Sequence, residues 1–362
     1  MRHQRRQERD IGNDAADVGF LKAPVQLLDR DLAGRVFAPV WRAARLPASL
    51  RAAPGSDERW LLVARAGVAS DRLVAAAQQR GVAVTRVEPG ASLPELSGHG
   101  DVIVACGEPG DAMLASADAL EAAQAAGVEA ALDVIKALLE RNAQPRLWLV
   151  TRRTQAVRRD EPVVPTHAPV WGLGRTLGYE QPQLRCTLVD LGESDEAEAL
   201  VDEVLARTDE TEVALRSHGR FVGRLVRDAI AATGPVPVRS DATYLVTGGL
   251  GGLGLSVAAW LAEQGASHMV LTSRHGVATP VQQQAVEALR ARGCEVRAMA
   301  IDAGDGAAVA ELMATIAATM PPLRGLVHAA GVLDDGMLAS GDAAWLRRVM
   351  APKLRGAIEL HR

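Results

Sequence analysis

The pattern that most clearly indicates a binding function is a glycine-rich run, TGGLGGLG, at 247–254. An apolar, strand-like segment (243–247) precedes it, and an apolar-periodic, helix-like segment (252–264) follows it. Glycines let a backbone turn tightly and approach a pyrophosphate, while the following helix points unpaired N–H groups at the anion. The run therefore predicts a dinucleotide loop; the alternative is a tight turn that binds nothing. The candidate cofactor-binding residues of the run are Thr247, Gly248, Gly249, Leu250, Gly251, Gly252, Leu253 and Gly254.

Two further segments bear on which dinucleotide would bind. The next predicted strand ends in Ser273-Arg274, with no acidic residue that could bind a ribose 2′-hydroxyl. An arginine can pair with a 2′-phosphate, so this pattern favours NADPH over NADH; alternatively, Arg274 is an ordinary solvated side chain. After the third strand, Asp302 could accept a hydrogen bond from the adenine amino group, or it could cap the helix predicted over 305–319.

Strand-like and helix-like runs alternate along most of the chain, which predicts parallel sheets covered by helices. Residues 34–228 read as one such α/β unit. At the place of the glycine loop it has Arg65 and Val68 where glycines would be needed, and Gly67 is the only glycine there. Backbone approach to a cofactor is blocked there, so we expect no cofactor in this unit. The unit's predicted strands are 59–67, 82–89, 101–107, 146–154 and 184–192, its predicted helices are 70–81 and 116–142, and a hairpin over 212–227 turns at His218-Gly219.

The pattern restarts after a segment rich in alanine, proline and small polar residues, 229–242, which reads as a linker. Beyond it, residues 243–362 form a second α/β unit. Residues 1–33 are predicted to be a disordered lead-in. The second unit's predicted strands are 243–247, 268–273, 295–301 and 324–329, and its predicted helices are 252–264, 280–292, 305–319 and 342 to the end.

Composition excludes several other classes of protein. The 362 residues are 48% hydrophobic and 23% charged with a net charge of −4, which is typical of a globular protein without a nucleic-acid surface. The three cysteines are far apart and the histidines form no ligand cluster, so we expect buried thiols and no metal. No apolar run is long enough for a bilayer and no signal peptide is present, which predicts a cytoplasmic location and no membrane partner.

Taken together, the motifs resemble a known family. TYLVTGGLGGLG, LTSRHG, LRGLVHAAGVLDDGML and VMAPKLRGA are similar to the ketoreductase domain of modular or mycobacterial-type type I polyketide synthases, within the short-chain dehydrogenase/reductase superfamily. The stretch APVWGLGRTLGYEQPQLRCTLVDL (168–191) resembles the non-catalytic subdomain that precedes the catalytic one. The resemblance implies two tandem Rossmann-like units: a structural subdomain that binds no cofactor, and an incomplete NADP-binding Rossmann half.

The resemblance also implies an activity and a set of residue roles. The parent enzyme would use NADPH to reduce a β-ketoacyl thioester on an acyl carrier protein, with other polyketide synthase domains as partners. Lys353 matches the lysine of the catalytic tetrad, which would hold the ribose hydroxyls and lower the pKa of a tyrosine. The stretch that supports the nicotinamide side comprises His328, Ala329, Ala330 and Gly331, and the motif associated with D-hydroxy (B-type) products comprises Leu333, Asp334 and Asp335.

Each of these roles has a plainer alternative. A lone histidine at a strand end can be a structural residue, a helical lysine can be surface decoration, and two acids in a loop can serve solubility. The family's catalytic serine and tyrosine find no match either, since the two tyrosines, Tyr179 and Tyr244, lie in other contexts. We therefore expect the isolated chain to be an inactive fragment; the alternative is a non-catalytic nucleotide-binding or scaffold protein.

Overall fold

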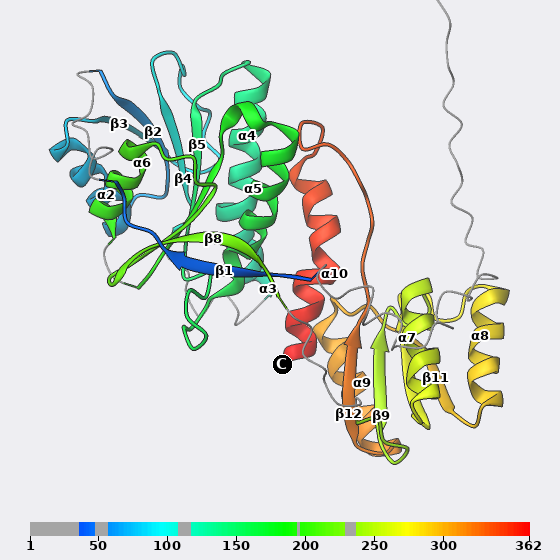
Figure 1. Ribbon diagram of the computed structural model, residues 1–362. Helices are drawn as coiled ribbons and strands as arrows, with labels where there is room; N and C mark the ends of the chain where they lie inside the picture. The colour runs from blue at the N-terminus through cyan, green and yellow to red at the C-terminus, as the bar shows by residue number, and fades with distance from the viewer. Residues whose placement is uncertain (1–35, 48–56, 108–116, 194–195, 229–236) are drawn as a thin grey trace, which may run out of the picture. The chain divides into compact units, whose positions relative to one another are not determined.

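The computed structural model describes residues 36–47, 57–107, 117–193, 196–228 and 237–362 (Figure 1). The predicted lead-in (1–33) and residues 229–236 of the predicted linker lie outside this part. The described residues divide into two compact units. The first unit comprises 36–228 with 334–347, and the second comprises 237–333 with 348–362.

The first unit is built on an eight-stranded sheet of order β1-β8-β7-β6-β5-β4-β2-β3. From β3 to β7 all neighbours pair in parallel, whereas β8 pairs antiparallel with β7 and with β1. The strands β4, β5 and β6 lie in the middle and are buried on both faces, as their continuous apolar runs require. The strands are β1 (Phe37–Ala43), β2 (Arg59–Val63), β3 (Ala83–Val87), β4 (Asp101–Ala105), β5 (Arg146–Arg152), β6 (Thr187–Leu191), β7 (Glu212–Arg216) and β8 (Gly219–Arg227).

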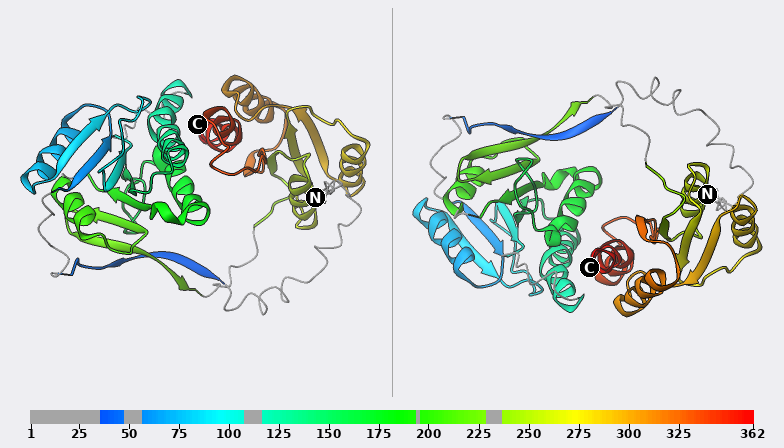
Figure 2. Two further views of the ribbon diagram at one scale, coloured as in Figure 1. Left: turned by 90° about the horizontal axis from the view of Figure 1, so that it is seen from above. Right: turned by 90° about the horizontal axis from the view of Figure 1, so that it is seen from below.

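Helices cover both faces of this sheet, as the two views of Figure 2 show. On one face α2 (Val68–Gln79) packs against α6 (Ala197–Ala206). The helix predicted over 116–142 is present, but it is α3 (Ala117–Gln124) and α4 (Ala130–Glu140) joined by a π-helical turn, η4 (Ala125–Glu129). The turn η4 also contacts α5 (Ala168–Glu180), which follows the 3₁₀ turn η5 (Pro165–His167); a second 3₁₀ turn, η6 (Pro182–Leu184), follows α5.

Residues 334–347 are part of the first unit because they contact its helices. The backbone N–H of Leu338 donates to Glu180 over 2.8 Å, and Leu338 is itself 3% exposed. The guanidinium of Arg347 donates to Glu129 over 2.7 Å, and the Glu129 side chain is only 7% exposed. Removing the cationic partner of a buried carboxylate costs free energy, because the charge is then left buried and unpaired. This ion pair therefore holds the segment on the first unit.

The second unit has a four-stranded parallel sheet of order β11-β10-β9-β12. The strands are β9 (Thr243–Thr247), β10 (His268–Ser273), β11 (Glu295–Ala300) and β12 (Leu323–His328). The helices are α7 (Gly252–Glu263), α8 (Pro280–Ala291), α9 (Gly306–Thr319) and α10 (Ala343–His361), of which α10 contributes residues 348–361 to this unit. Counted in chain order the strands run 3-2-1-4, which is the order of a dinucleotide-binding half, so the predicted α/β fold class is confirmed.

Two local predictions were wrong. The hairpin between β7 and β8 turns at Ser217-His218, since Arg216 pairs directly with Gly219, so the predicted turn is displaced by one residue. No strand is predicted before residue 59, whereas β1 lies at Phe37–Ala43, because its partner β8 lies far away in the sequence and gives no local signal. Among the described helices, none is long and apolar enough to cross a membrane.

Candidate functional site

The glycine loop joins the carboxyl end of β9 to the amino end of α7. Gly248 has a φ of +66°, which a side chain would disfavour, and a Cβ there would lie 2.6 Å from the backbone of Ala329. A Cβ on Gly254 would overlap the carbonyl oxygen of Gly248, so the first turn of α7 lies directly on the loop. These two glycines are therefore required by the loop's own packing.

Gly252 differs from those two glycines, because a Cβ built on it meets nothing within 4 Å. It is the first residue of α7. The N-cap residue is Gly251, so no side chain accepts a hydrogen bond from the first backbone amides of the helix. The open space at Gly252 and the uncapped backbone amides of α7 together fit an approaching pyrophosphate. The surroundings of Gly248, Gly252 and Gly254 thus fit the turn, the backbone approach and the helix packing that a dinucleotide loop needs.

The other residues of the loop support its shape. A Cβ on Gly249 would lie 2.6 Å from the Val246 carbonyl oxygen, and one on Gly251 would lie 3.3 Å from that of Gly248. Leu250 is 2% exposed and belongs to the core, whereas Leu253 is 72% exposed. Thr247, the last residue of β9, is 1% exposed.

The end of β10 lies beside the loop because β10 pairs directly with β9. The hydroxyl of Ser273 donates to the Gly276 carbonyl over 2.9 Å, which holds the turn after the strand. Arg274 follows with an exposed side chain, for which the described residues offer no ion-pair partner. The position and freedom of this guanidinium fit a 2′-phosphate.

Asp302 follows β11 and is exposed. Its carboxylate accepts from the backbone N–H of Gly304 over 2.9 Å. The helix cap of α9 is instead Asp305, which accepts from Ala307 and Ala308 over 3.0 and 3.2 Å. The capping alternative for Asp302 is therefore wrong, because the chain turns once more before the helix begins.

His328 at the end of β12 is held on both sides of its ring. Nε2 lies 2.8 Å from the carbonyl oxygen of Pro352 in α10, and Nδ1 lies 2.6 Å from the hydroxyl of Thr247. A carbonyl only accepts, so Nε2 carries a proton; in the neutral ring, Nδ1 then accepts from the threonine hydroxyl. Gly356 makes room for the ring, since a Cβ there would lie 3.2 Å from the histidine Cε1. The structural alternative for His328 is thus supported: the histidine connects β9, β12 and α10.

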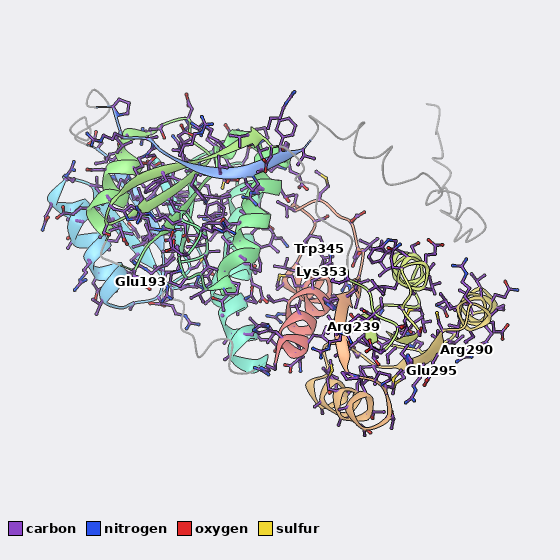
Figure 3. All side chains as sticks on the ribbon, turned by 60° about the horizontal axis from the view of Figure 1, so that its bottom comes forward. Glu193, Arg239, Arg290, Glu295, Trp345 and Lys353 are labelled. Atoms are coloured by element: carbon purple, nitrogen blue, oxygen red, sulfur yellow. The ribbon has the colours of Figure 1, made fainter. Side chains whose placement is uncertain are left out.

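Lys353 comes from α10, one residue after Pro352, and is exposed (Figure 3). A Cβ added to Gly331 would lie 3.7 Å from Cε of Lys353. Ala329 and Ala330 lie next to Gly248, and the N–H of Ala329 donates to the Thr247 carbonyl over 2.9 Å. The glycine loop, the stretch 328–331 and Lys353 are therefore brought together at the carboxyl edge of the second sheet. Pro352 and Gly356 belong to the motif VMAPKLRGA, in which the resemblance assigned a role to Lys353 alone.

The remaining candidate residues lie elsewhere. Leu333 is 88% exposed, Asp335 is exposed, and the backbone carbonyl of Asp334 accepts from the Trp345 indole over 2.8 Å. The Tyr244 side chain is 7% exposed and its hydroxyl accepts from the backbone N–H of Arg239 over 2.7 Å. Tyr179 is 90% exposed and belongs to the first unit. No cluster of three or more metal-ligating side chains occurs among the described residues.

The fold and the loop define a dinucleotide-binding protein of the short-chain dehydrogenase/reductase type. The family described as KR domain matches residues 242–362, and the one described as polyketide synthase extender module SpnB, Rossmann fold domain, matches residues 36–225. The chain belongs to the ketoreductases of modular polyketide synthases, whose cofactor is NADPH. Both the predicted family and the predicted cofactor are confirmed.

Solved structures agree with this assignment. The first ketoreductase of the tylosin polyketide synthase is 31% identical with a TM-score of 0.71, and the match covers 90% of this chain and 69% of that one. An A-type ketoreductase from a modular polyketide synthase is 30% identical with a TM-score of 0.72, and the match covers 90% and 71%.

Curated relatives are much longer proteins. The 5-methyl-1-naphthoate synthase of Streptomyces sahachiroi is 33% identical over 346 residues, which are 89% of this chain and 18% of the synthase. A phenolphthiocerol/phthiocerol polyketide synthase of Mycobacterium tuberculosis is 41% identical over 224 residues, which are 60% of this chain and 12% of that protein. The chain thus spans less than a fifth of the length of these relatives.

Proposed function

We propose that the carboxyl edge of the second sheet holds NADPH, with named residues at each part of the cofactor. The pyrophosphate lies over Gly252 at the amino end of α7, Arg274 pairs with the 2′-phosphate, and Asp302 accepts from the adenine amino group. The observation that carries this proposal is the open space at Gly252 beside an uncapped helix end. Bound there, NADPH supplies a hydride to a carbonyl carbon.

The nicotinamide end lies between the 328–331 stretch and Lys353. His328 holds α10 through the Pro352 carbonyl, so it positions Lys353 rather than contacting the cofactor. The ammonium of Lys353 is exposed beside Gly331, where it can bind the ribose hydroxyls. In the parent enzyme this arrangement reduces a β-ketoacyl thioester on an acyl carrier protein, and the motif Leu333-Asp334-Asp335 favours the D-hydroxy, B-type product.

The 362-residue chain by itself is proposed to bind NADPH without reducing a ketone. Protonation of the developing alkoxide needs an acid at the nicotinamide end. Tyr244 is buried in β9 with its hydroxyl bonded to Arg239, and Tyr179 belongs to the first unit. A nucleotide-binding scaffold is the alternative function, favoured by the same observation, and it differs in predicting no reduction even within a complete synthase module.

The cofactor proposal is tested by measuring the affinities for NADPH and NADH through nicotinamide fluorescence. The wild-type chain should prefer NADPH by about tenfold or more, and Arg274→Ala should abolish that preference, since one charge-assisted pair contributes about 1.5–3 kcal/mol. Arg292→Ala is the matched control: Arg292 is exposed on the same unit, following α8, and pairs with Glu263. An unchanged NADPH preference in Arg274→Ala would refute the phosphate assignment.

Activity is tested with a β-ketoacyl thioester and NADPH. The isolated chain should bind NADPH yet oxidise none of it, whereas the same chain within a complete module should give the D-hydroxy product. Turnover by the isolated chain would show that the missing acid is supplied after all. An L-hydroxy product from the module would contradict the stereochemical proposal, and no reduction there would favour the scaffold.

A further inference from the structure

The first unit contains a cavity of its own at the carboxyl ends of its parallel strands. It has a volume of about 600 Å³ and is bounded by the residues that end β2, β4, β5 and β6, by the amino end of α2, and by α3 and η4. From β2 the chain passes to β3 on one side of the sheet, while β4 lies on the other side, so the strand order reverses at this point. In open α/β sheets, ligands bind in the crevice at such a reversal. This volume is also typical of small-molecule sites.

One side chain that lines this cavity lacks the hydrogen bonds it needs. His167 in η5 is 1% exposed, and neither ring nitrogen has a partner among the described residues. Burial lowers the pKa of His167 to about 4, so at neutral pH the ring is uncharged and offers one donor and one acceptor. A buried polar atom without a partner costs about 1–3 kcal/mol, so a ligand atom that reached this imidazole would remove that cost.

The hydroxyl side chains that line the cavity are already hydrogen-bonded, which distinguishes His167 from them. The Thr151 hydroxyl donates to Asp190 over 2.7 Å and accepts from the Trp171 indole. The Ser70 hydroxyl points back to the carbonyls of Arg65 and Gly67. Of the charged lining residues, Arg152 pairs with Glu196 over 3.2 Å and Glu193 pairs with Arg153 over 3.5 Å.

The local backbone is arranged around this histidine. Its ring packs against Gly127, where a Cβ would lie 3.4 Å from the ring Cδ2. Gly127 lies in the π-helical turn η4, and such turns within α-helices are frequent at functional sites. The neighbouring side chain of Gln124 donates to the Thr166 carbonyl over 2.7 Å, which fixes η5 against the helix.

The amino end of α2 gives the cavity an anion-binding side. The helix is capped by Gly67, which is extended and provides no side chain, and a Cβ on Gly67 would meet nothing within 4 Å. The exposed Arg65 also lines the cavity. Backbone amides, the positive end of the helix dipole and a guanidinium all favour a small anion. Another part of the lining is apolar and consists of four alanines on one helix face: Ala119, Ala122, Ala123 and Ala126.

We propose that this cavity binds a small organic acid. The carboxylate lies at the amino end of α2 and accepts a hydrogen bond from His167, and the apolar body lies along the four alanines. Arg65 and Val68 stand where a dinucleotide site needs glycines, so the ligand is smaller than a dinucleotide. The proposal is independent of the NADPH site, which lies in the second unit.

Octanoate is the probe, titrated into the full chain and followed by calorimetry and by NMR of histidine-labelled protein. Saturable binding with a shift of the His167 ring resonances is expected, together with an affinity about tenfold or more above that of 1-octanol, which lacks the charge. Inorganic phosphate, which lacks the apolar body, should bind more weakly than octanoate. NADPH should not compete with octanoate.

A pair of substitutions locates the site. Ala122 and Ala125 are both exposed on the same continuous helix, but only Ala122 lines the cavity. Ala122→Trp should lower octanoate affinity by about tenfold or more, while Ala125→Trp should leave it within about twofold. The proposal is overturned by the absence of saturable binding, by equal affinity for 1-octanol or phosphate, by competition from NADPH, or by equal effects of the two tryptophans.

Discussion

At the scale of single residues, the glycines of the loop separate into two kinds that the sequence pattern treats alike. Gly254 is needed because any side chain would overlap the carbonyl of Gly248, whereas Gly252 faces open space. The first kind serves the fold, and the second is where we propose that the pyrophosphate lies. The spacing TGxxxGxG predicted the loop. The two kinds of glycine differ only in which atoms of the folded protein surround each Cβ position.

This difference predicts opposite effects of two identical substitutions. Gly254→Ala should destabilise the second unit by about 1–3 kcal/mol, since the loop must move to admit the methyl group. Gly252→Ala should leave stability within about 0.5 kcal/mol yet weaken NADPH binding by about tenfold or more. Urea denaturation and NADPH titration of both variants measure this. Full NADPH affinity in a stable Gly252→Ala variant would argue that the pyrophosphate lies elsewhere.

His167 gives the first unit a dependence on pH. Its pKa falls from 6.5 to about 4 on folding because burial disfavours the charged ring. The unfolded chain therefore binds the proton more readily, so the stabilisation is complete above pH 6.5 and is lost as the pH falls toward 4. The difference amounts to about 3 kcal/mol at most.

Comparison of wild type with His167→Gln isolates this contribution, because both chains share all other titrating groups. Between pH 6.5 and 4 the wild type should lose more free energy of unfolding than the variant, as measured by urea denaturation. His218→Gln provides the control, since His218 is exposed in the same unit. Identical pH profiles for wild type and His167→Gln would mean that the imidazole is protonated without cost.

At the scale of elements, α10 shows how a helix can be placed by one side chain from a strand. Pro352 lies inside the helix and has no N–H, and its carbonyl accepts from His328 at the end of β12. Gly356 lets the ring reach that carbonyl. Lys353 is the next residue after Pro352, so the position of its ammonium depends on the histidine.

His328→Leu should therefore destabilise the second unit by about 1–3 kcal/mol, because the buried hydroxyl of Thr247 loses its acceptor. It should also weaken NADPH binding more than Lys353→Ala does, since it disturbs both α10 and the end of β9. His361→Leu, at the exposed end of α10, is the control. Unfolding in urea and NADPH titration provide the two measurements; an effect no larger than that of His361→Leu would count against the positioning role.

The element pattern was predictable where structure is local. Alternating strands and helices with capping and glycine signals correctly predicted two sheets built mainly of parallel strands. Strand β1 was not predictable, because it exists only by antiparallel pairing with β8, almost two hundred residues later in the chain. The π turn η4 was not predictable either, because its alanine-rich sequence suits an uninterrupted helix. The irregularity accompanies the packing of Gly127 against His167, which is distant in sequence.

At the scale of the whole molecule, each unit has a hydrophobic core of its own. One core is centred on Trp60, Trp148 and their neighbours in the first sheet, and the others are built around Val246 and Leu245 in the second. The second sheet has four strands, and its edge strand β12 leaves Leu326 39% exposed. We therefore expect the second unit to open at lower denaturant concentration than the first.

Hydrogen exchange in increasing urea, read by mass spectrometry, would separate the two units. Peptides from β9 and β10 should lose protection before those from β4 and β5. NADPH at about one hundred times its Kd should raise the opening free energy of the first set by about 2.7 kcal/mol and leave the second set unchanged, because a ligand stabilises only the unit that holds it. Octanoate bound in the cavity beside His167 should instead raise the opening free energy of β4 and β5 and leave that of β9 and β10 unchanged. Equal protection of all four strands by NADPH would instead mean that α10, which contributes to both units, makes the chain unfold as one.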